Sequence, residues 1–102
     1  MTCRKPNEKQ ALSLFLAERY VSSANPELAH LDAARASAAS KEPTESGKTV
    51  RYLGSTLIPS DETCFVLFEA FTAEEVRHLL ERASLPYDRI VEAVRIGPED
   101  RP

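Results

Sequence analysis

Large hydrophobic residues gather in six segments of the 102-residue chain, and polar or turn-forming residues separate these segments. Four segments are dense in large apolar and β-branched residues, which is typical of strands, and two have the spacing and composition of helices. The predicted strands are residues 12–21, 49–58, 63–70 and 89–96, and the predicted helices are residues 26–40 and 73–84.

Both predicted helices begin at a capping signal. Asn25 is a favourable N-cap, and Pro26 suits the first turn, where its missing N–H removes no hydrogen bond. In the second helix, Thr72 and Glu75 form a capping box, in which each side chain accepts from a backbone N–H of the first turn. We expect apolar residues to follow one line along each helix: Leu28, Leu31, Ala34 and Ala38 in the first, and Val76, Leu79, Leu80 and Ala83 in the second.

The order of elements, β-α-β-β-α-β, predicts an α+β fold of the ferredoxin-like type, a four-stranded antiparallel sheet with two helices on one face. Residues 59–62, Pro-Ser-Asp-Glu, have turn chemistry, so the two middle strands form a hairpin. We favour the register in which Arg51 lies across from Glu69, although the turn permits a one-residue slip that would send the two side chains to opposite faces. The favoured register also pairs Leu53 with Leu67, Ser55 with Phe65, and Leu57 with Thr63.

The helix-free face of this sheet is predicted to be apolar. In the strand at 63–70, Phe65 and Leu67 point to one side while Cys64, Val66 and Phe68 point to the other, and the strand at 12–21 is also apolar on both sides. A sheet face in water should be polar. We therefore expect a second copy of the chain to cover it, in a homodimer of the dimeric α/β-barrel type joined through the helix-free sheet face.

Composition restricts the class of protein. With 42% hydrophobic residues the chain can form a core, which we expect over residues 11–96 as one domain, between flexible tails at 1–10 and 97–102. A net charge of −3 and the lack of a basic cluster argue against nucleic acid as a partner, and no apolar run is long enough to cross a membrane. The N-terminus lacks the apolar stretch of a signal peptide, and Cys3 and Cys64 do not make a disulfide framework, so we expect a cytoplasmic protein.

No residue pattern identifies catalytic chemistry. The three glycines form no phosphate-binding loop, and no Ser/His/Asp or Cys/His arrangement is evident from spacing, so the catalytic residues are unknown. Polar side chains within the predicted strands are candidates for a ligand pocket, although paired or solvated strand-end charges are the simpler interpretation. The candidate ligand-binding residues are Glu18, Tyr20, Arg51, Tyr52 and Glu69.

Two stretches carry a resemblance to a known family. Residues 50–70, with Asp-Glu-Thr-Cys-Phe, and residues 85–94, with Leu-Pro-Tyr-Asp-Arg-Ile, together with Glu18-Arg-Tyr upstream, resemble small bacterial domains of unknown function, one branch of which is described as nickel-binding. The resemblance covers about residues 12–95 and implies a ferredoxin-like dimer. Nickel is implied by this resemblance only. From the residues themselves we expect no cofactor and no metal site, with His30 as a weak candidate ligand and His78 as a weaker one.

Two functions of different classes follow. The first is a binding or interaction module, a homodimer with at most weak metal or small-ligand binding. The alternative is a cofactor-free small enzyme of the dimeric α/β-barrel class, monooxygenase- or isomerase-like, which rests on fold analogy. A pocket with two or more convergent polar groups, including Tyr20, Tyr52 or Glu69, would favour the enzyme, and a filled apolar interior would favour the module.

Overall fold

The computed structural model describes residues 11–42 and 50–98 and has the predicted ferredoxin-like order of elements. The strands form one antiparallel sheet in the order β2-β3-β1-β4. The elements are β1 (Ser13–Tyr20), α1 (Glu27–Ser40), β2 (Arg51–Ile58), the short 3-10 helix η2 (Pro59–Asp61), β3 (Thr63–Ala70), α2 (Ala73–Arg82) and β4 (Arg89–Ala93).

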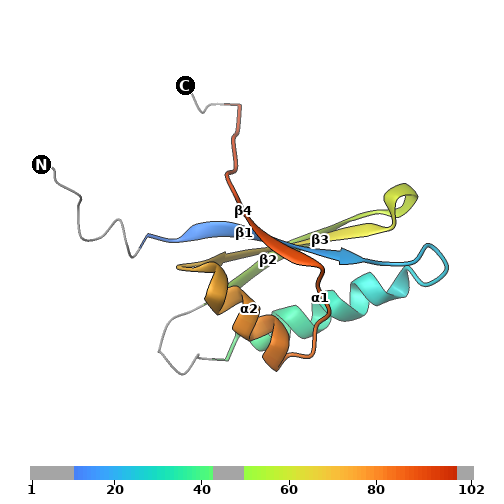
Figure 1. The fold of residues 1–102 in the computed structure, drawn as a ribbon, viewed down its shortest axis with the longest axis horizontal. Coiled ribbons are helices and arrows are strands. Elements are labelled where there is room, and N and C mark those ends of the chain that lie inside the picture. The colour runs from blue at the N-terminus through green and yellow to red at the C-terminus, as the bar shows by residue number, and fades with distance from the viewer. Residues whose placement is uncertain (1–10, 43–49, 99–102) are drawn as a thin grey trace, which may run out of the picture.

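The molecule has two layers, with both helices on one face of the sheet (Figure 1). The core lies between the layers, where alternate residues of β1 and β3 point toward the helices. Phe68, Leu79 and Leu80 are among its largest buried side chains. Cys64 is also buried, as expected for a small apolar residue.

The two helices begin in different ways. In α2 the backbone N–H of Glu75 donates to Thr72 Oγ1 at 3.2 Å, and the Glu75 carboxylate accepts from the backbone N–H of Phe71 at 3.3 Å, so the predicted cap is confirmed. The predicted Asn25 side-chain cap is wrong, because α1 takes Pro26 as its N-cap and makes no side-chain cap bond. The backbone carbonyl of Asn25 accepts from Leu28 instead.

The buried side of α1 also differs from the predicted line. Leu31 is 45% exposed, and Ala34 and Ala38 are exposed as well. The residues that face the sheet are Ala29, Asp32 and Ala36. Asp32 forms an ion pair with Arg19 of β1, which turns this side of the helix inward at the expense of the more hydrophobic one.

The β2–β3 hairpin contains a β-bulge that the sequence analysis missed. Arg51 lies across from Glu69 as predicted, but the register then shifts by one residue between Tyr52 and Gly54. Beyond the bulge the predicted pairs are wrong: Gly54 faces Leu67, Thr56 faces Phe65, Leu57 faces Cys64, and Ile58 faces Thr63. Gly54 has a φ of 143°, a backbone conformation that side chains with a Cβ rarely adopt. The shift turns Ser55 and Leu57 toward the helices.

β4 ends at Ala93, three residues before the predicted Ile96. Its pairing partner β1 begins at Ser13, and Ala93 lies across from Leu14, so β1 offers almost no further residue for β4 to pair with. Val94 and Ile96 are consequently 79% and 78% exposed, on a segment that leaves the sheet on the side away from the helices (Figure 1). The expected tail at residues 1–10 lies outside the described residues, as do residues 43–49 and residues 99–102 of the expected tail at 97–102. No described helix is long and apolar enough to cross a membrane.

Candidate functional site

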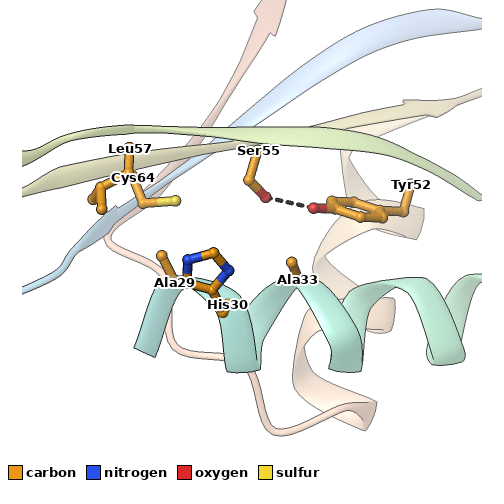
Figure 2. Close-up of a pocket in the computed structure, with 7 residues that line it drawn as sticks. All are labelled: Ala29, His30, Ala33, Tyr52, Ser55, Leu57 and Cys64. Atoms are coloured by element: carbon orange, nitrogen blue, oxygen red, sulfur yellow. Dashed lines mark hydrogen bonds between the residues drawn. The ribbon is translucent and has the colours of Figure 1, made fainter. Parts of the chain in front are cut away.

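A pocket of about 200 Å³ opens between α1 and the β2–β3 hairpin. Helix α1 forms its lower wall and the hairpin its upper wall, and the labelled side chains point toward the space between them (Figure 2). The lining residues are Ala29, His30 and Ala33 from α1, Tyr52, Ser55 and Leu57 from β2, and Cys64 from β3.

The bulge in β2 places the two hydroxyl groups of this pocket. Side chains of a regular strand alternate between faces, so residues three apart would point to opposite sides of the sheet. The extra residue lets Tyr52 and Ser55 share the helix side, across from Phe68 and Val66. Tyr52 Oη and Ser55 Oγ lie 2.6 Å apart in a hydrogen bond, and the Tyr52 ring packs at a tilt against Phe68 with centroids 5.8 Å apart. The tyrosine hydroxyl is therefore fixed at one end of the pocket.

Cys64 closes the other end of the pocket with a neutral thiol. Burial raises the pKa of the Cys64 thiol, and the negative charge of Asp32 raises it further, while Arg19 opposes these effects. Arg19 and Asp32 form an ion pair between β1 and α1, and their side chains are only 14% and 6% exposed. Arg19 also donates to the carbonyl of Tyr20 at 2.7 Å. A nucleophilic cysteine needs its thiolate form, which this environment disfavours.

Metal ligands do not gather in the part of the chain that the structure describes. No three His, Cys, Asp or Glu side chains come together there. His30 lines the pocket with only the neutral thiol of Cys64 beside it, and Asp32 is held by Arg19. His78 lies on α2, where its Nε2 is 3.2 Å from Glu74 Oε2. Nickel favours several imidazole or carboxylate ligands, so these residues of one subunit do not fit a resident nickel site.

The predicted ligand-binding residues do not share one site within the subunit. Tyr52 lines the pocket, whereas Tyr20 lies 55% exposed at the end of β1. The remaining three are on the helix-free face: Arg51 pairs with Glu69 at 2.7 Å, and Glu18 pairs with Arg89 of β4 at 2.8 Å.

Of the seven lining residues, only Tyr52 is among the predicted ligand-binding residues. The sequence analysis names His30 only as a weak candidate metal ligand, and its predicted pairing of Ser55 with Phe65 puts Ser55 on the opposite side of the sheet from Cys64. Gly54, a glycine within a β-rich segment, is the one sequence signal for the bulge that places Ser55 in this pocket.

The helix-free face of the sheet is apolar at its centre. Leu16 lies across from Leu67 on one side and Val91 on the other, and the neighbours of Leu16 and Leu67 along their strands belong to the core. Leu14 and Phe65 extend this apolar surface, and its members are only partly buried. The ion pairs Arg51–Glu69 and Glu18–Arg89 lie toward opposite ends of it. Both helices lie on the other face, so no described element covers this one (Figure 1).

Comparison with known proteins gives one match. No curated protein and no solved structure matches the chain. The family model described as nickel responsive protein SCO4226-like matches residues 15–93, which include all the strands and helices from Phe15 of β1 to the end of β4. A match over most of the chain, ending where the ferredoxin-like fold ends, places this protein in the SCO4226-like nickel responsive protein family.

Proposed function

We propose that this protein is a non-catalytic binding protein that works as a homodimer joined through its helix-free sheet faces. One observation carries the proposal: the apolar surface of Leu14, Leu16, Phe65, Leu67 and Val91 has no cover among the described residues. Monomeric proteins seldom leave contiguous apolar patches of this kind in water. A second copy is the simplest cover, because the same surface then serves both partners.

The charges on this face support a second copy as the occupant. Each of its two ion pairs joins one cation to one anion, so these pairs give the face no net charge. Two copies of the face therefore repel each other little when they meet. Val94 and Ile96 leave the sheet on the same side and are highly exposed, which adds apolar surface for a partner to bury. Glu18, Arg51 and Glu69 would then lie between the two sheets, where they are candidates for contacts with a ligand held by the dimer.

The family's name makes nickel a candidate ligand. We expect nickel to bind this chain weakly, because the donor set of the subunit pocket is one imidazole and one neutral thiol. The unpaired thiol of Cys64 also supports the cytoplasmic location expected from the sequence.

A cofactor-free enzyme is the second candidate function. The observation in its favour is that Tyr52, Ser55 and His30 converge on one pocket, since hydroxyl and imidazole groups can exchange protons with a bound molecule. These convergent polar groups meet the criterion that the sequence analysis set for the enzyme. Binding ranks first because the family is described by a response to nickel and not by a reaction.

Native mass spectrometry of protein purified without a metal-binding tag tests the proposal, since it reads subunit number, bound metal and carried ligand together. We expect twice the subunit mass of 11.3 kDa. Leu67→Glu should yield monomers because it places a charge at the centre of the face. Thr56→Glu, at an exposed position of the same face, tests the same point without removing an apolar side chain, and Ala34→Glu on the exposed side of α1 is the matched control. A wild-type protein that remains monomeric at micromolar concentration would refute the dimer.

A further inference from the structure

The pocket between α1 and the hairpin has no permanently charged side chain in its lining. Three of the seven lining residues are apolar, and the hydroxyls of Tyr52 and Ser55 are neutral. The thiol of Cys64 is held in its neutral form, and the nearest charges behind it, Arg19 and Asp32, neutralise each other. A charged ligand would therefore lose part of its hydration without gaining a counter-charge, which is costly.

One end of the pocket is equipped to recognise a polar group. In the hydrogen bond between Tyr52 Oη and Ser55 Oγ, only one hydroxyl hydrogen is used, whichever oxygen donates. The other hydroxyl keeps a hydrogen to donate, and both oxygens keep an accepting lone pair. The imidazole of His30 lies on the opposite wall, below Cys64 and Ser55 (Figure 2). A neutral imidazole adds one donor and one acceptor.

The rest of the pocket is suited to an apolar body. Ala29 and Ala33 present only methyl groups from α1, which is why space remains beneath β2, and Leu57 covers the far end next to Cys64. A volume of about 200 Å³ corresponds to roughly seven water molecules, using about 30 Å³ for each. A single six-membered ring with one short substituent is of this size.

We propose that this pocket binds a small uncharged molecule with a ring-sized apolar body and one polar head that both donates and accepts hydrogen bonds, such as an aryl amide. The head lies against Tyr52 and Ser55, and the body packs on Ala29, Ala33 and Leu57. This inference gives the ligand class for the binding role proposed above, and it depends on that role but not on the dimer.

Three probes of nearly equal shape test the charge requirement: benzamide, benzoate and benzamidinium, which are neutral, anionic and cationic. Each is titrated into 15N-labelled full-length protein at pH 8, where histidine side chains are largely neutral. Backbone amide shifts in α1 and β2 then report binding at the pocket. We expect benzamide to bind with a Kd on the order of 1 mM, as fragments of this size do. The two charged probes should bind at least tenfold more weakly, and equal binding of all three would overturn the proposal.

Two pairs of variants test the location. Ala33→Leu fills the pocket and should abolish the benzamide shifts, whereas Ala34→Leu, on the exposed side of the same helix, should leave them unchanged. Ser55→Ala should weaken benzamide binding about three- to tenfold, the usual effect of one lost hydrogen bond. Ser60→Ala, at an exposed position outside the pocket, is its control. Benzamide binding that survives Ala33→Leu would contradict the assignment.

Light scattering on the same samples separates this inference from the dimer proposal. A dimer that shows no benzamide shifts would remove the pocket assignment alone. A monomer that binds benzamide with the expected selectivity would remove the dimer alone.

Discussion

Gly54→Ala should destabilise the protein through the backbone alone. A Cβ built at position 54 has no heavy atom within 4 Å, so no steric contact opposes the substitution. The φ of 143° is the obstacle, because a residue with a Cβ rarely adopts it. Residues held in such sparsely populated regions cost about 1–3 kcal/mol each. Since domains of this size are stable by only about 5–15 kcal/mol, the loss should be easy to measure.

Urea denaturation followed by circular dichroism measures this effect as a lower midpoint at an unchanged slope. Ser60→Ala is the control, because Ser60 is an exposed residue of the same hairpin outside the pocket and its substitution should cost less than about 1 kcal/mol. The Gly54→Ala variant should also weaken benzamide binding, since a relaxed bulge would no longer hold Tyr52 and Ser55 on the same side of the sheet. A midpoint equal to that of the wild type would refute the claim that Gly54 holds the bulge.

Three further predictions concern two ion pairs and one helix cap. Asp32→Ala leaves Arg19 buried without its partner and should lower the free energy of unfolding by about 3 kcal/mol in a urea melt. Adding Arg19→Met should restore part of this stability, and a loss below about 1 kcal/mol for Asp32→Ala alone would contradict this account. Thr72→Ala removes the α2 cap and should cost about 0.5–2 kcal/mol in the same assay, and an unchanged melt would show that the cap contributes nothing. A double-mutant cycle on Arg51 and Glu69 in the monomeric Thr56→Glu background should give a coupling of only about 0.2–1 kcal/mol, because the Arg51 side chain is 63% exposed in a single copy of the chain, and a larger value would contradict this account.

The sequence by itself determined the order of elements and hence the fold. Local signals carried this information: the dense runs of large apolar residues in β1 and β3, the capping box of Thr72 and Glu75, and the turn at residues 59–62. The pairing of Arg51 with Glu69 was also predicted, although the register next to the turn was not: the pairs from Ile58 to Gly54 are offset by one residue, and the bulge brings Arg51 back across from Glu69. Each of these features depends on residues close in sequence or on one strand pairing.

Tertiary structure decided the orientation of α1 and the ion pair beneath it. Leu28 packs against the core as predicted, but the rest of the predicted line is exposed, beginning with Leu31. Hydrophobic spacing does not show that Asp32 meets Arg19 from a strand thirteen residues earlier. From the sequence, an aspartate such as Asp32 is expected at the surface, because charged side chains are rarely buried unless they are paired.

The candidate pocket was decided by the bulge in β2. Side chains alternate strictly along a strand, so one inserted residue exchanges the two faces for everything that follows. The predicted pairs put Ser55 and Leu57 on the same side as Phe65 and Thr63. The shift puts them on the helix side instead, where they join Tyr52 and Cys64. Gly54 shows in the sequence that an irregularity is permitted, but the position of the extra residue depends on how β3 and α1 pack against the strand, which only the folded chain defines.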